Sequence, residues 1–276
     1  GNKKSKEYSL YLKSKIEESL KLVNDYHSQI FPLRKQCYNN LTQVSLDDQL
    51  LEVPVYNHAG VTGRTSITSG YNFLTMKKNK RQLLKSLKKD HTLVEVDFKS
   101  CEPFFYLKSN GFNIESVRDV YHWISQNYEV KIKSRDKFKR GILSMLYGAN
   151  EYTTSKVMQI DMSVVKRIKS ELGINDLNVK LENEFNENGF IKNYYGRPVT
   201  NNNNLVNYWI QSSAVDFCSL AFYDFYKNCD LSPCFFIHDS MTFEIHKSRI
   251  SAIKEINEIL EPISNISIPV EFNILN

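Results

Sequence analysis

Two aspartates stand at positions where a carboxylate can bind a metal ion. Asp97 ends an apolar, β-branched stretch at residues 92–98, whose alternation predicts a strand. Asp239 lies in the turn between two short predicted strands, 234–237 and 242–245, a pattern typical of a hairpin. Beside apolar strands a carboxylate is costly unless it meets a cation or a hydrogen-bond donor. Two on neighbouring strands could hold two Mg²⁺ ions about 3.5–4 Å apart, an arrangement for phosphoryl transfer, although either aspartate alone more often caps a turn.

A second group of residues lies on one face of a predicted helix at residues 135–148. Arg135, Lys139, Leu143 and Tyr147 recur at every fourth position and therefore share one side of that helix. The two cations suit a triphosphate, and the apolar and aromatic side chains that follow suit a sugar and a base. The alternative is an ordinary basic amphipathic helix with a solvated face. Combined with the paired aspartates, this graded surface favours a nucleotide site.

The elements around these residues predict a mixed fold. From apolar spacing, helices are predicted at 5–29, 81–89, 115–128, 135–148, 163–172, 177–188, 205–228 and 248–260. In addition to the three strands already named, strands are predicted at 51–56 and 266–275. Because strands stand at both ends of a helical block, the sequence predicts an α+β fold with a helical lobe inserted into a sheet.

Composition restricts the partners. The net charge of +5 is unevenly placed, since basic residues cluster at 77–89 and 131–140. Such clusters suit the phosphates of a nucleic acid, or they are simply solvated helix faces. The five cysteines form no CxxC pair and no zinc spacing, which is typical of reduced thiols in an intracellular protein. No apolar run reaches the ~20 residues that a bilayer span needs, so no membrane partner is expected.

Five segments, in order along the chain, resemble the motifs of the family A DNA polymerases, the DNA polymerase I family. They are Thr62-Gly63-Arg64-Thr65-Ser66 with Asn72-Phe73-Leu74, which resembles TGRxS…NLQ; Asp97-Phe98-Lys99-Ser100-Cys101-Glu102, which resembles motif A, DYSQIE; Arg135, Lys139 and Tyr147-Gly148, which resemble motif B; Asn207 and Gln211 after Tyr195-Gly196-Arg197; and His238-Asp239-Ser240, which resembles motif C, usually His-Asp-Glu. The resemblance implies a right-hand polymerase fold, with an antiparallel palm sheet, an inserted helical fingers lobe and a reduced or missing thumb.

The resemblance also implies a role for each matched residue. Two Mg²⁺ ions, or Mn²⁺ in their place, would be bound by Asp97, Asp239 and the backbone carbonyl of Phe98, with Lys139 as a further catalytic residue. The incoming nucleotide would be bound by Arg135, Lys139, Leu143, Tyr147 and Glu102. Primer–template DNA would be contacted by Arg64, Asn207, Gln211 and His238, and by Lys78 and Arg81 of the first basic cluster. The expected partners are therefore dNTPs and primer–template DNA.

Three positions bear on the choice between DNA and RNA synthesis. Leu143 and Ser240 resemble the distantly related single-subunit RNA polymerases, whereas the bacterial DNA enzymes usually have Phe or Tyr at the first position and Glu at the second. Glu102 resembles the DNA enzymes, in which this glutamate fills the space that a ribose 2′-hydroxyl would need. With the TGRxS segment, Glu102 favours deoxynucleotides. We therefore expect a template-directed DNA polymerase that extends a primer 3′ end.

The same resemblance divides the chain into four parts. These are an N-terminal helical region that is a reduced thumb or a docking segment at 1–60, the first part of the palm at 61–110, the fingers at 111–190 and the second part of the palm at 191–276. The residues before the first motif are too few for a full thumb, and no 3′–5′ exonuclease domain fits in this length. We therefore expect no proofreading, and a separate thumb, exonuclease or processivity subunit is a candidate partner. The expected location is inside a cell, in the cytoplasm or nucleoid, or in an infected host cell.

Two other functions stay open at this point. A related nucleotidyltransferase, such as a single-subunit RNA polymerase, a primer-making enzyme or a terminal transferase, would use the same aspartates and cations. A non-catalytic DNA-binding assembly module is the other alternative, but it has no physical need for paired aspartates beside a cationic helix. Asn207 and Gln211 argue against a template-free enzyme, which would need no template contacts.

Overall fold

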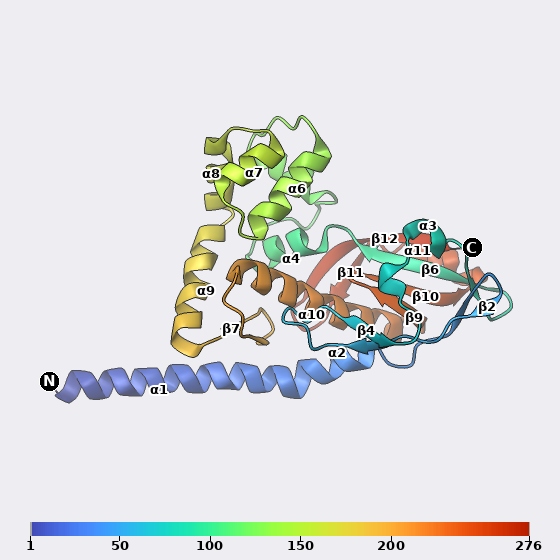
Figure 1. Ribbon diagram of the computed structural model, residues 1–276, viewed down its shortest axis with the longest axis horizontal. Helices are drawn as coiled ribbons and strands as arrows, with labels where there is room; N and C mark the ends of the chain where they lie inside the picture. Colours follow the sequence, from blue (N-terminus) through green and yellow to red (C-terminus); the bar gives the residue numbers. More distant parts are fainter. Residues whose placement is uncertain (1, 276) are drawn as a thin grey trace.

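A five-stranded antiparallel sheet forms the centre of the molecule (Figure 1). The computed structural model describes residues 2–275, with side chains from Leu10 onward except those of residues 12 and 15. The strands follow the spatial order β11-β12-β6-β10-β9. Their bounds are β6 His91–Phe98, β9 Ser232–Ile237, β10 Ser240–His246, β11 Glu258–Glu261 and β12 Ile266–Leu275. Strand β6 pairs on both sides with strands from the C-terminal part of the chain, so the helical block between them is an insertion into the sheet.

The side chains of β6 alternate between two hydrophobic cores. Val94, Val96 and Phe98 belong to the main core, and Leu93 belongs to a smaller one. The long helix α10 (Leu205–Asn228) covers the main-core face, where the rings of Phe98 and its Phe222 lie 4.8 Å apart. Successive side chains of a strand point to opposite faces of the sheet, so β6 is buried on both faces.

Segments from the N-terminal half close the smaller core. The ring of Phe73 stacks on that of Phe235 of β9, with 4.0 Å between the centroids. The elements there are β1 Val44–Leu46, β2 Gln49–Leu50, β5 Leu84–Ser86 and the 3₁₀ turn Phe73–Thr75, with the strand order β2-β1-β5. Two short ribbons complete the strands: β3 Val55–Asn57 with β4 Ser66–Ser69, and β7 Ile191–Lys192 with β8 Pro198–Val199.

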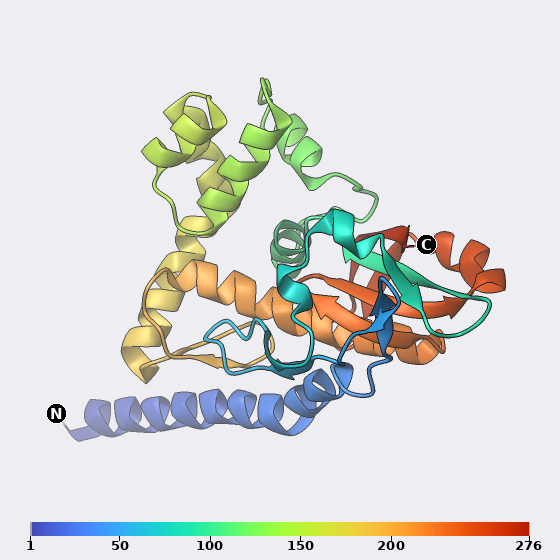
Figure 2. The ribbon, with the colours of Figure 1, turned by 45° about the vertical axis from the view of Figure 1, so that its right-hand side comes forward.

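The inserted block is a lobe of short helices that stands above the sheet (Figure 2). After α4 (Cys101–Ser109), which packs on the main core, the lobe contains α5 Val120–Asn127, α6 Arg135–Leu146, α7 Glu151–Met158, α8 Met162–Glu171 and α9 Ile174–Asn188. Four of these helices begin after a side chain that accepts a backbone N–H of the first turn, which are Asp119, Ser134, Asn150 and Asp161. The predicted α+β fold, an antiparallel palm sheet with an inserted helical lobe, is confirmed.

A long N-terminal helix runs along the edge of the molecule. Helix α1 (Asn2–Asp25) continues through a π-helical turn, Tyr26–Ile30, into α2 (Phe31–Cys37), which packs against α10. Figures 1 and 2 both show α1 extending away from the sheet toward the chain's N-terminus. Several of its large apolar side chains, Leu10 and Ile16 among them, are exposed. Among the described residues, no helix has the length and apolar character needed to cross a membrane.

The predicted helix 81–89 is wrong and the predicted helix 248–260 is too long, because sheet pairing overrides local spacing. Helix α3 covers only Lys78–Arg81, and β5 follows it within the predicted helix 81–89, with Leu84 buried and paired to β1. Within 248–260 the α-helix is only α11 (Ile250–Lys254), and the end of the stretch is strand β11.

Candidate active site

Strand β6 and the β9–β10 hairpin bring Asp97 and Asp239 to the same end of the sheet. Ser240 is the partner of Asp97 across β10 and β6. The backbone N–H of Phe98 donates to the carbonyl oxygen of Asp239 over 3.1 Å, which fixes the hairpin turn against β6. His238, at the tip of that turn, has a positive φ of 54°. The two aspartates predicted as metal ligands are therefore neighbours, Asp97 near the end of β6 and Asp239 in the β9–β10 turn beside it.

Both of these carboxyl groups have a raised pKa. Burial, followed by the charges of Asp239 and Glu95, raises the pKa of Asp97 to about 7. Burial also raises the pKa of Asp239, and the charge of Glu102 adds to that effect. A cation beside the pair would relieve this cost, so the donors fit a divalent metal ion. Among the described residues no group of three or more His, Cys, Asp or Glu could hold a metal ion, so further ligands would be backbone, water or substrate oxygens.

The raised pKa of Asp97 predicts how stability changes with pH in metal-free protein. The folded-state pKa of about 7 exceeds the ordinary 3.8, so this group's contribution to stability is complete below about pH 4. It is lost as the pH rises through 7, because the folded protein must then hold an unpaired carboxylate. With EDTA present, we expect Asp97→Asn to exceed wild type in melting temperature at pH 8, and to exceed it by a smaller margin at pH 5, where only part of this stability is lost.

Mg²⁺ should offset the loss of stability that ionised Asp97 causes at high pH. It should raise the melting temperature of wild type more at pH 8 than at pH 5, and it should raise that of Asp97→Asn less. The check is thermal unfolding followed by circular dichroism at both pH values, with and without Mg²⁺. A difference between Asp97→Asn and wild type that does not depend on pH would contradict the burial argument.

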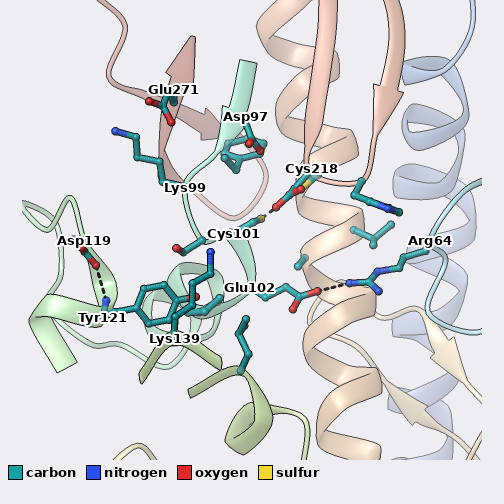
Figure 3. A pocket seen from close by; sticks show the side chains of 18 of the residues that line it. Arg64, Asp97, Lys99, Cys101, Glu102, Asp119, Tyr121, Lys139, Cys218 and Glu271 are labelled. Carbon is teal, nitrogen blue, oxygen red and sulfur yellow. Dashed lines mark hydrogen bonds and ion pairs between the residues drawn. The ribbon is translucent and has the colours of Figure 1, made fainter. Parts of the chain in front are cut away.

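Glu102, in the first turn of α4, is held from two sides. Arg64 Nη2 donates to Glu102 Oε1 over 2.8 Å (Figure 3). The hydroxyl of Tyr147 donates to Glu102 Oε2. Burial and the charge of Glu102 raise the pKa of Tyr147, so its phenol stays protonated and remains a donor. The Glu102 side chain is only 14% exposed, whereas that of Arg64 is 45% exposed. Three predicted residues from three separate segments thus form one fixed group.

The cations of α6 lie beside an aromatic ring of α5. Arg135 Cζ and Lys139 Nζ are each 5.8 Å from the centre of the Tyr121 ring, within the range of a cation–π contact. Arg135 also donates to Asp119, the residue that caps α5. The predicted face of α6 is therefore supported by a neighbouring helix that the motifs did not include.

One pocket of about 670 Å³ joins these groups, a volume in the range of small-molecule sites. Ten of the predicted site residues line it, namely Arg64, Asp97, Phe98, Glu102, Arg135, Lys139, Leu143, Tyr147, His238 and Asp239. The carboxylates lie on the sheet side and the cations on the lobe side. Chemically, this arrangement offers a cation-binding pair and a surface for phosphates in one pocket, with the anchored carboxylate of Glu102 in the same wall.

The four other predicted residues lie outside the lining of this pocket. Asn207 and Gln211 are half-buried, one turn apart on α10, and among the described residues Asn207 Oδ1 has no hydrogen-bond partner. Lys78 is exposed. Its positive charge opposes part of the upward shift in the pKa of Asp97, so Lys78 lies near the carboxylate pair. Arg81 is placed differently from the expectation, because its Nη1 donates to the buried Glu95 over 2.5 Å.

A buried polar network that sequence reasoning missed holds the loop of Arg64. Arg34 of α2, fully buried, pairs with the equally buried Asp216 of α10 over 3.3 Å and donates to the carbonyl oxygen of Gly63. Arg197 Nη1 donates to the carbonyl oxygen of Thr62 over 3.0 Å. Gly63 has a φ of 72°, and a Cβ added there would overlap the guanidinium of Arg197. In the sequence, this network is indicated by a charged residue within each of two predominantly apolar stretches, Arg34 and Asp216.

Lys99, Asp119 and Tyr121 also line the pocket and were missed. Figure 3 shows all three on the left of the view, across the pocket from Arg64. Lys99 lies within the segment that resembles motif A, but the resemblance implies no role for it, and Asp119 looks like an ordinary helix cap. Their sequence positions carry no signal of the pocket because its wall forms only when the lobe folds onto the sheet.

Comparison with known proteins gives a match in structure but none in sequence. No protein-family model and no curated protein matches the chain. Among solved structures, the fold is similar to the POL domain of Pol1 from M. smegmatis in complex with DNA primer-template and dNTP, with a TM-score of 0.55 and 15% sequence identity. The match covers 80% of this chain and 47% of that chain, so the chain spans about half the length of that structure. The molecule therefore has the fold of a DNA polymerase domain.

Proposed function

We propose that this chain is a template-directed DNA polymerase that adds deoxynucleotides to a primer 3′ end. One observation carries the proposal. Residues from widely separated segments line a single pocket, which combines a carboxylate pair, two cations and the Glu102 carboxylate fixed by Arg64 and Tyr147. A scaffold or a simple DNA-binding module has no need for this combination, because the paired carboxylates cost stability when no cation is present.

Asp97, Asp239 and the backbone carbonyl of Phe98 would hold two Mg²⁺ ions, or Mn²⁺ in their place. Such ions, when bound, promote ionisation of a hydroxyl nucleophile and neutralise charge on a departing pyrophosphate. Arg135 and Lys139 would bind the phosphates of the incoming dNTP and stabilise the negative charge that develops on them. The Arg135 side chain is 59% exposed, and Lys139 is exposed as well. Both line the pocket, so a triphosphate can reach them.

The remaining predicted residues would position the nucleic acid. Leu143 and Tyr147 would lie against the nascent base pair, and His238 would contact the primer terminus. Arg64, Asn207 and Gln211 would contact primer and template, with Lys78 nearby. In this proposal residues 61–110 and 191–276 form the palm, 111–190 form the fingers, and 1–60 are a reduced thumb or a docking segment for a thumb, exonuclease or processivity subunit.

The proposal is tested by primer extension on a defined template with Mg²⁺. Four reactions are compared: dNTPs or rNTPs, each with a recessed primer–template or with the primer alone. We expect addition of the templated dNTP and little addition in the other three reactions. Addition without template would indicate a terminal transferase, and efficient rNTP addition would indicate an RNA polymerase, as Leu143 and Ser240 suggest. No addition in any reaction would contradict a catalytic role for this chain.

Glu102→Ala should relax the choice of sugar. Because Arg64 and Tyr147 fix the Glu102 carboxylate, the space it fills cannot easily open for a ribose 2′-hydroxyl. Forcing extra atoms into a filled space costs about 1–3 kcal/mol, so removal of the side chain should lower the preference for dNTP over rNTP by roughly 5- to 150-fold. The measurement is kcat/KM for the matched dNTP and rNTP.

The matched control for this change is Glu115→Ala, since Glu115 is exposed and does not line the pocket. That variant should keep the wild-type preference. An unchanged preference in Glu102→Ala, in protein that still extends with dNTPs, would mean that another residue selects the sugar.

A further inference from the structure

The two carboxylate oxygens of Asp119 have different partners. Oδ1 accepts the backbone N–H of Tyr121 over 3.0 Å and that of His122 over 3.2 Å, which caps α5. Oδ2 accepts from Arg135 twice, from Nε over 3.1 Å and from Nη2 over 2.7 Å. One side chain thus joins the start of α5 to the first residue of α6.

These contacts use one edge of the Arg135 guanidinium and leave the other available. A guanidinium has five N–H donors in a fixed plane, and Asp119 engages the Nε–Nη2 edge. Among the described residues, no hydrogen bond involves Nη1. The Nη1–Nη2 edge can therefore bind phosphate oxygens in the bidentate manner that arginine favours.

The surroundings support an ordered side chain rather than a passing surface contact. Arg135 Cζ lies 5.8 Å from the Tyr121 ring centre, and Tyr121 is itself buried. Although partial burial opposes it, hydrogen bonds from Arg135 and from the backbone of His122 lower the pKa of Asp119, so this carboxylate is ionised at neutral pH. The carboxylate, the ring and the guanidinium all line the same pocket.

We propose that Asp119 is a positioning residue, which holds Arg135 with its free edge ready for the triphosphate of the incoming nucleotide. The inference rests on the proposed function and adds a residue that none of the motifs contains. Holding the side chain in advance removes the ordering cost that a flexible arginine would incur on binding. The opposite possibility is that Asp119 competes with the triphosphate for Arg135, and the two possibilities predict opposite changes in nucleotide affinity.

Asp119→Asn separates the two contacts of this side chain. Asparagine caps a helix about as well as aspartate does, so α5 keeps its cap while the charge that holds Arg135 is lost. We expect the KM for dNTP, and the Kd for a dNTP with Mg²⁺ measured by calorimetry, to rise about 3- to 10-fold. The kcat should change less than KM. A general loss of folding would instead lower the amount of active protein and leave KM unchanged.

Asp161→Asn is the matched control. Asp161 caps α8 through an Oδ1 bond of 2.7 Å to the backbone N–H of Ser163, and it does not line the pocket. The same change there should leave KM and Kd at wild-type values. In an Arg135→Gln background, Asp119→Asn should have no further effect on dNTP affinity, because its only route to the nucleotide is through Arg135.

Three results would overturn the inference. Unchanged or tighter dNTP binding by Asp119→Asn, with wild type extending primers, would reject the positioning role and leave the proposed function intact. A full effect of Asp119→Asn in the Arg135→Gln background would show that it acts by another route. Wild type that neither extends a primer nor binds a dNTP would reject both proposals.

Discussion

Asp239→Asn and Asp97→Asn are each expected to reduce primer extension by roughly 10³-fold or more, since metal-assisted charge stabilisation at a phosphoryl group supplies at least that factor. Each change keeps the shape of the side chain and removes one of the two carboxylates that meet where β6 adjoins the β9–β10 hairpin. The measurement is single-nucleotide addition under single-turnover conditions, with Mg²⁺ varied. The variants should still bind primer–template, because neither carboxylate attracts a phosphate.

Two controls make this result interpretable. Asp48→Asn alters a side chain that is 89% exposed and lies outside the pocket, so it should keep wild-type activity. The melting temperature of metal-free Asp97→Asn at pH 8 should be at least that of wild type, which excludes unfolding as the cause of lost activity. If either active-site variant kept activity within tenfold of wild type, the carboxylate pair would not be the metal site.

The local parts of this site could be predicted from the sequence. The strand that ends at Asp97 follows from strict alternation of β-branched residues, and β6 ends one residue later, at Phe98. The shared face of Arg135, Lys139, Leu143 and Tyr147 follows from helical spacing, and all four line the pocket. Such features depend on near neighbours only, which is why spacing alone predicted them.

Features that depend on distant partners could not be predicted. Arg81 belongs to a basic cluster, and only the folded sheet shows that the buried Glu95 of β6 is its partner. Leu84 lies in a helical pattern, yet its burial and its pairing with Leu46 make it part of a strand. Asp119 reads as a helix cap, which it is, and its contact with Arg135 depends on how α5 and α6 pack.

Arg34→Met should be strongly destabilising. Arg34 and Asp216 are both fully buried, and their contact joins α2 to α10. Removal of one partner leaves the other charge buried, which costs about 3–5 kcal/mol. Urea unfolding should show a lower midpoint with an unchanged slope, because the folded state loses an interaction without a change in exposed surface.

Arg249→Met provides a matched control for that experiment. Arg249 also donates to backbone carbonyl oxygens, those of Cys229 and Asp230, but it does so on an exposed surface. We expect its effect on the free energy of unfolding to stay within about 0.5 kcal/mol. A loss in Arg34→Met no larger than this would mean that Arg197, 3.7 Å from Asp216, can neutralise that aspartate alone.

The network around Arg34 has a second, functional consequence. Arg34 donates to the carbonyl oxygen of Gly63, the residue before Arg64, and Arg64 in turn holds Glu102. If that chain of contacts sets the sugar preference, Arg34→Met at a temperature where it remains folded should admit rNTPs more readily than wild type does. The shift should be smaller than in Glu102→Ala, because Tyr147 still holds the carboxylate. An unchanged preference would show that the loop keeps its position without Arg34, and that the buried pair serves stability alone.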